Sequence, residues 1–218
     1  TKNKPWSSDE NLMHISFEAG MLEDPWEKPL EEMFEYSVSP QKAPDKASEI
    51  LIDFENGIPI SVNSEKMSPA KLLAYLNKLG GENGIGRVDM VESRFVGMKS
   101  RGVYETPGGT ILHATHRAIE SITIDRDVMN LKDSLMPRIA SLIYNGFWFS
   151  PEMKLLKNMI SESQKGVTGE VRIELYKGNC TVTGKKAPKS LYNKDIASMD
   201  KGFEKYNPKD AEGFININ

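Results

Sequence analysis

Residues 86–107 read GRVDMVESRFVGMKSRGVYETP. Ionisable side chains of both signs stand here among β-branched, aromatic and glycine residues. A strand that simply buried one face would not carry so many of them, because unpaired buried charge is costly. We therefore expect this stretch to line a polar pocket, with Gly97 and Gly102 beside the charged groups.

Glu92 and Tyr104 are the two side chains in this stretch that we select as candidate ligand contacts. A carboxylate at Glu92 suits a ligand ammonium, and the phenol of Tyr104 offers one hydroxyl at a fixed distance. The alternative is structural: Glu92 would pair with Arg94 or Arg101, as charges at strand ends often do. From the chemistry of the residues alone, the two readings stay open.

A second polar face is predicted near the start of the chain. Residues 12–19 alternate with a period of two, which is typical of a half-buried strand. His14, Ser16 and Glu18 would then point to the same side. With a second hydroxyl nearby, this face suits a small zwitterionic ligand. For residues 7–11, the structural alternative is a turn or a helix N-terminus.

The remaining pattern predicts an α+β fold with a mixed or antiparallel sheet and long helices. Asn56–Gly57 indicates a hairpin turn, and Pro59 favours an edge position for its second strand. We expect helices at 69–79, ending at Gly80–Gly81, and at 109–123, 125–147 and 151–164, with a kink or break at Pro137. Further expectations are an extended stretch at 25–48 with a helical turn at 30–34, and a hairpin at 169–184. The end, 188–218, is expected to be irregular with a short helix near 190–195, and 213–218 to show an unfinished apolar alternation.

Composition excludes several classes of protein. The net charge of −3 over 218 residues argues against a general nucleic-acid binder, and no apolar run approaches the length of a membrane helix. Cys180 is the only cysteine, so no internal disulfide can form; this fits a reducing compartment, and we expect the cytoplasm. We assign Cys180 no nucleophilic role.

No cofactor motif is recognisable in the chain. His14, His113 and His116 lack a completing ligand set, so we expect no metal site. The glycine-rich residues 80–86 lack the Lys–Ser/Thr of a Walker A motif and are expected to be a helix stop and turn.

Several motifs in order resemble those of argininosuccinate synthase. They are PWSSDENLMHISFEAG (5–20), LEDP (22–25), GIGRVDMVE (84–92), GMKSRGVYETP (97–107), GFWFSP (146–151), SLYN (190–193) and GFININ (213–218). The series covers most of the chain. The number, order and length of these motifs make chance agreement unlikely.

The resemblance implies a ligase that joins citrulline to aspartate at the expense of ATP, held with Mg²⁺. It gives argininosuccinate, AMP and pyrophosphate through a citrullyl-adenylate. The family's citrulline-binding residues fall on Ser7, Ser16, Glu92 and Tyr104. Where the family pattern has an asparagine before the arginine, this chain has Ser93, which puts one neighbouring contact in doubt.

The resemblance also implies what lies outside this chain. We expect residues 1–218 to be the synthetase/multimerisation domain, without the family's N-terminal nucleotide-binding domain and C-terminal oligomerisation helix. The chain is thus expected to be the later part of a longer protein and inactive alone. Family members are usually homotetramers, with residues 109–164 as plausible contacts. The alternative is a non-enzymatic module that binds an amino acid or only assembles subunits.

Overall fold

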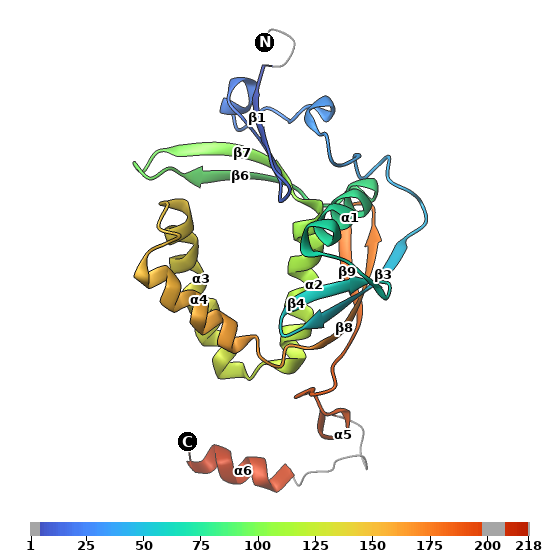
Figure 1. The fold of residues 1–218 in the computed structure, drawn as a ribbon, viewed down its shortest axis with the longest axis vertical. Coiled ribbons are helices and arrows are strands. Elements are labelled where there is room, and N and C mark those ends of the chain that lie inside the picture. The colour runs from blue at the N-terminus through green and yellow to red at the C-terminus, as the bar shows by residue number, and fades with distance from the viewer. Residues whose placement is uncertain (1–4, 198–207, 218) are drawn as a thin grey trace.

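The computed structural model describes residues 5–197 and 208–217 as two antiparallel sheets with long helices. This confirms the expected α+β class. One sheet has four strands and the other has five. In Figure 1 the four-stranded sheet lies at the top, the five-stranded sheet with α1 and α2 at the right, and the α3–α4 pair at the left. The elements are β1 Ser7–Glu10, β2 Ile15–Glu18, β3 Ser48–Glu55, β4 Ile58–Val62, β5 Glu65–Lys66, α1 Pro69–Glu82, β6 Arg87–Ser93, β7 Lys99–Glu105, α2 Pro107–Thr123, α3 Arg126–Tyr144, α4 Pro151–Ser163, β8 Gly169–Tyr176, β9 Asn179–Lys186, α5 Lys194–Ala197 and α6 Pro208–Ile217.

The four-stranded sheet has the order β1-β2-β7-β6. Its back face buries Ile15, Phe17 and Val103 against Leu22 and Met33 of the segment that links β2 to β3. We call this segment, residues 19–47, the crossover. It is irregular apart from two 3₁₀ turns, and the second of these, at 31–33, confirms the helical turn expected at 30–34.

The five-stranded sheet has the order β5-β4-β3-β8-β9 and packs against α1 and α2 around the main apolar core. Asn56 and Gly57 have φ of 49° and 78°, as the predicted hairpin requires. The edge position expected for β4 is wrong, because β5 pairs outside it. Only Ser61 and Val62 take part in that pairing, so Pro59 still avoids a ladder hydrogen bond.

Helix α1 does not stop at Gly80–Gly81 as expected, but continues to Glu82. Both glycines are needed for close packing instead. A Cβ at Gly80 would lie 2.9 Å from Pro107 Cβ, and one at Gly81 would lie 1.9 Å from the carbonyl oxygen of Tyr36. The helix ends only at Asn83, and Gly84 then takes a positive φ of 72°.

Helices α3 and α4 form an antiparallel pair around the buried side chains of Leu142, Met153 and Leu156. Helix α3 runs through Pro137, so the break considered there does not occur. The Ser150 hydroxyl caps α4 by accepting from Met153 N–H at 3.2 Å. No described helix combines the length and apolar character required to cross a membrane.

Two expectations for the end of the chain need correction. The short helix expected near 190–195 lies at Lys194–Ala197. The described part of the alternation, residues 213–217, belongs to a helix, α6, which begins at Pro208. Proline is favoured in the first helical turn, where its missing N–H costs nothing. Residues 198–207 and 218 lie outside the described part.

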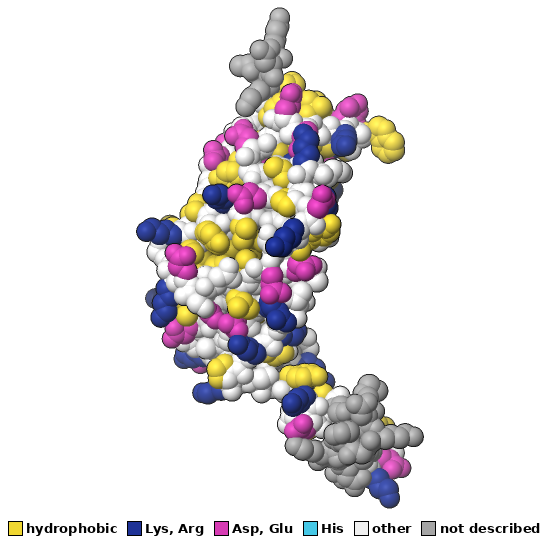
Figure 2. Space-filling view, turned by 90° about the vertical axis from the view of Figure 1, so that its right-hand side faces the viewer, with side chains coloured by type: hydrophobic (Ala, Val, Ile, Leu, Met, Phe, Trp, Pro, Cys, Tyr) yellow, Lys and Arg dark blue, Asp and Glu magenta, His cyan; other side chains and the backbone are white. Residues whose placement is uncertain are grey.

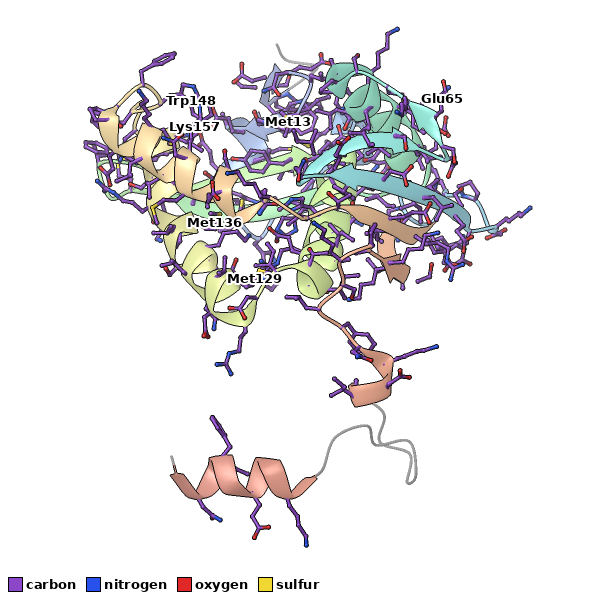
Figure 3. The ribbon with its side chains drawn as sticks, turned by 60° about the horizontal axis from the view of Figure 1, so that its bottom comes forward. Met13, Glu65, Met129, Met136, Trp148 and Lys157 are labelled. Carbon is purple, nitrogen blue, oxygen red and sulfur yellow. The ribbon has the colours of Figure 1, made fainter. Side chains whose placement is uncertain are left out.

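A charge cluster with a buried centre, Glu120 and Lys132, joins the α3–α4 pair to α2. Glu120 is fully buried; its carboxylate lies 3.2 Å from Lys132 Nζ and accepts from Gln164 Nε2 at 2.9 Å. Arg117 bonds Asp133 at 2.8 Å through both of its terminal nitrogens. Met129 and Met136 of α3, labelled in Figure 3, lie beside the cluster. Each charge thus has a partner of opposite sign.

Replacing Glu120 by Gln should destabilise the fold by about 3 kcal/mol, because it removes the nearer carboxylate from the buried Lys132 ammonium and leaves it only Asp133 at 3.5 Å. Urea denaturation would measure this. The matched control is Glu152→Gln, which breaks the exposed Arg138–Glu152 pair and should change stability little. Equal effects of the two variants would contradict the importance of the buried pair.

Candidate functional site

The candidate site lies on the front face of the four-stranded sheet, away from the crossover. Residues directly opposite in an antiparallel pair share a face. Ser16 is opposite Asp9 of β1 and Tyr104 of β7, and Tyr104 is opposite Val88 of β6. Ile15 and Phe17 are buried while Ser16 and Glu18 are half-exposed, which confirms the alternation expected for this strand. Figure 1 shows this front face turned toward α3 and α4.

The four predicted site residues all lie on this front face. Ser7 is opposite Glu18, which stands two residues from Ser16 on the same face. Glu92 stands four residues from Val88 on β6, and its Oε1 accepts a hydrogen bond from the Tyr104 hydroxyl. Ser16, Glu92 and Tyr104 are therefore brought together. Ser7 lies at the exposed outer strand, farther from the pair.

Two predictions for residues 7–19, near the start of the chain, need correction. Within the segment at 7–11, Ser7–Glu10 is strand β1 and not a turn or a helix start, and only Asn11 takes part in a turn. Leu12 and Met13 are in the turn between β1 and β2, so the strand is shorter than the 12–19 alternation. Asn11 shapes this turn: its Oδ1 accepts from the N–H groups of Met13 and His14 at 2.8 and 3.2 Å.

The alternative partners considered for Glu92 are wrong. Arg94 donates to Glu18 at 2.8 Å, and Arg101 binds Asp89 at 2.7 Å. Among the described residues, Glu92 thus has the Tyr104 hydroxyl as its hydrogen-bond partner. Asp9, Glu18 and Glu92 place three carboxylates on the front face. The Arg94 guanidinium binds Glu18, so the face carries an excess of negative charge that favours a ligand ammonium.

About half of the ionisable groups in 86–107 do not face a pocket, contrary to expectation. Arg101 donates to the carbonyl oxygens of Asp24 and Glu27, each at 2.8 Å, and so binds the crossover on the back face. Arg87 also binds the crossover, by donating to the side chains of Ser37 and Glu31. The pattern of charges alone could not divide these groups between the two faces.

The two glycines singled out in this stretch have different roles. Gly97 lies at the hairpin tip with no atom within 4 Å of an added Cβ, so it serves the turn and no pocket. Gly102 lies beneath the ring of Tyr104: an added Cβ would be 2.6 Å from the hydroxyl oxygen. The missing side chain at Gly102 lets the Tyr104 phenol lie flat along the sheet toward Glu92.

An apolar groove of ≈ 310 Å³ adjoins the hydroxyl groups. It is lined by Met13, His14, Val88, Met90, Tyr104 and Thr106. The rings of His14 and Tyr104 lie 5.9 Å apart and are tilted by 59°. Met13, labelled in Figure 3, comes from the turn between β1 and β2. The site therefore combines an apolar slot with a hydroxyl and carboxylate border, an arrangement common in small-molecule pockets.

No metal-binding group is present among residues 5–197 and 208–217: nowhere do three His, Cys, Asp or Glu side chains gather. His116 bonds Gln164 at 2.9 Å, whereas His14 lies at the groove.

Burial raises the pKa of the Cys180 thiol to about 11, which keeps it protonated at neutral pH. Figure 2 shows cationic and anionic side chains interspersed over the visible face.

Burial, followed by the hydrogen bond to Glu92, raises the pKa of Tyr104 from 10.0 to about 12. The folded chain therefore holds this proton to higher pH than the unfolded chain, and stability should fall as pH rises from about 10 to about 12. Absorbance titration of wild type against Tyr104→Phe should isolate a late tyrosine. In Glu92→Gln that late titration should move to lower pH but stay above the ordinary value. A Tyr104 that titrates with the bulk tyrosines would contradict the geometry.

Comparison with known proteins gives a consistent family. The family model for the argininosuccinate synthase C-terminal domain matches residues 6–218. An argininosuccinate synthase from Desulfatibacillum aliphaticivorans is 62% identical over 218 residues, covering 100% of this chain and 54% of the relative. One from Syntrophotalea carbinolica is 58% identical over 219 residues, with the same coverage. The chain thus spans about half the length of the curated relatives it matches. It belongs to the argininosuccinate synthase family and matches the C-terminal domain of that family.

Proposed function

We propose that this chain supplies the citrulline-binding side of a ligase that joins citrulline to aspartate. In this reaction the ureido oxygen of citrulline attacks the α-phosphate of ATP, and the aspartate amine then displaces AMP from the citrullyl-adenylate. The products are argininosuccinate, AMP and pyrophosphate. Splitting one difficult substitution into two steps is a general device of such catalysis.

One observation carries the proposal: Ser16, Tyr104 and Glu92 stand together on one face of the sheet, next to an apolar groove. The hydroxyls of Ser7, Ser16 and Tyr104 would hydrogen-bond citrulline, and Glu92 would accept from a ligand N–H. The groove would take the methylene chain. These groups position the substrate and undergo no bond change themselves, so their contribution is geometric.

ATP with its Mg²⁺, and aspartate, are assigned mainly to the portion of the relatives that this chain does not match. Residues 80–86 support this assignment, because they form the end of α1 and a turn and have no Walker-type sequence. Residues 1–218 would then act as the synthetase/multimerisation domain, in the cytoplasm. The chain alone should form no argininosuccinate.

Citrulline binding can be tested by calorimetry or by NMR titration of the chain. Tyr104→Phe and Glu92→Gln should each weaken binding by about ten- to a hundredfold, since each removes a hydrogen bond of the site, at Glu92 one to a charged group. Tyr192→Phe and Glu152→Gln are matched controls: both residues are exposed and lie outside the four-stranded sheet. Equal binding by all four variants would contradict the proposed site.

A fusion supplies the kinetic test. The N-terminal portion of the Desulfatibacillum relative, joined ahead of residue 1, should restore ATP-dependent formation of argininosuccinate. The same substitutions should then raise the KM for citrulline and leave the KM for ATP nearly unchanged. Turnover by the unfused chain would contradict the assignment of ATP and aspartate to the portion that this chain does not match. A fusion that binds citrulline but forms no argininosuccinate would argue for the non-enzymatic alternative.

Assembly into a homotetramer is proposed for α3 and α4. A groove of ≈ 370 Å³ there is lined mainly by apolar side chains, including Val128, Leu131 and Met159, and Leu131 and Leu155 are more than half exposed. Exposed apolar surface of this kind marks a contact site. Sedimentation equilibrium should show an oligomer that Leu131→Glu weakens, whereas Tyr192→Phe should not. A wild-type monomer at all concentrations would refute this assembly.

A further inference from the structure

The turn between β1 and β2 is held from three separate elements. Three successive carbonyl oxygens accept side-chain hydrogen bonds: that of Asn11 from the Tyr36 hydroxyl at 3.3 Å, that of Leu12 from Asn77 Nδ2 at 2.8 Å, and that of Met13 from the Thr106 hydroxyl at 3.3 Å. Tyr36 is in the crossover, Asn77 in α1 and Thr106 directly after β7. A turn of ordinary mobility needs no such anchoring.

Asn77 is the most deeply placed of the three donors. It stands on the apolar side of α1, next to Leu76 and Leu73, and only 8% of its surface is exposed. Its Oδ1 accepts from Gly108 N–H at 2.9 Å while its Nδ2 donates to Leu12. The orientation of the amide is fixed, because a backbone N–H can only donate and a carbonyl can only accept. One side chain thus joins α1, the start of α2 and the turn.

The position of this turn decides where two site groups lie. His14 ends the turn and lines the apolar groove, and Ser16 follows it by two residues, opposite Tyr104. A carbonyl displaced at Leu12 would carry both of them away from Tyr104. Misplacement by about 1 Å can cost on the order of a hundredfold in a positioned reaction.

We propose that Asn77 is a positioning residue for the citrulline site: by holding the Leu12 carbonyl against α1 and α2 it sets His14 and Ser16 relative to Tyr104. The effect that we expect of Asn77 on citrulline binding rests on the proposed function. Its structural part, the location of the turn, can be tested without any ligand.

Asn77→Asp is the informative variant. The aspartate keeps an acceptor for Gly108 N–H but places an oxygen against the Leu12 carbonyl oxygen, so the donor is lost. The matched control is Asn83→Asp. Asn83 is also buried in the last turn region of α1, and its Nδ2 donates to Leu79 O at 2.9 Å, but it has no bond to the turn. Both variants therefore replace a buried asparagine by aspartate, at positions of similar exposed fraction.

NMR of the free chain should show shifted His14 ring and Ser16 amide signals in Asn77→Asp and unchanged ones in Asn83→Asp. Citrulline affinity should fall at least about tenfold in the first and remain near wild type in the second, although both variants melt at lower temperature. Unchanged His14 and Ser16 signals in Asn77→Asp would overturn the inference. So would an equal loss of affinity in the two variants, because general destabilisation would then explain it.

Two further outcomes are also decisive. If Asn77→Asp does not fold, Tyr36→Phe replaces it: this variant removes only the hydroxyl that reaches Asn11 and Glu10. It should shift the His14 ring and Ser16 amide signals away from their wild-type positions, and no shift would count against anchoring of the turn. If wild type binds no citrulline, the proposed function fails, while the ligand-free signals still decide whether Asn77 holds the turn.

Discussion

The antiparallel register between β2 and β7 is the constraint on which the candidate site depends. It sets Ser16 opposite Tyr104 on the front face and Phe17 opposite Val103 on the back. A slip by one residue would turn Ser16 into the apolar cluster and expose Phe17. Burial of Ile15, Phe17 and Val103 against the crossover opposes such a slip. Hydrophobic burial on one face therefore fixes hydroxyl positions on the other.

A buried carboxylate behind the sheet extends this constraint to the crossover. Glu105 is fully buried and accepts from the backbone N–H groups of Glu35, Tyr36 and Ser37, and from the Ser37 hydroxyl at 2.7 Å. A charge buried at this depth is tolerated because several donors replace its lost hydration. Since Tyr36 then reaches the β1–β2 turn, the back of the sheet is linked to the groups that border the site.

Much of the fold could be predicted from local signals. Asn56–Gly57 indicated its hairpin correctly, and the helices expected to begin at 69 and 151 do begin there. The errors arose where a residue serves a distant partner. Gly80 and Gly81 look like a helix stop, yet their missing side chains leave room for Pro107 and for the Tyr36 carbonyl. The charges of 86–107 look like one pocket, yet Arg87 and Arg101 bind the crossover on the back face.

The sequence by itself determined the α+β class, most element positions and, through its motifs, the family and the four candidate site residues. These follow from local periodicity, turn chemistry and ordered motifs, which do not depend on distant contacts. Only the tertiary structure decided which charges lie on the front face, that Glu92 is bonded by Tyr104 and not by Arg94 or Arg101, and that Asn77 reaches the turn. Those contacts join residues far apart in the chain. Strand register and side-chain packing set them, and neither is encoded in any single stretch of residues.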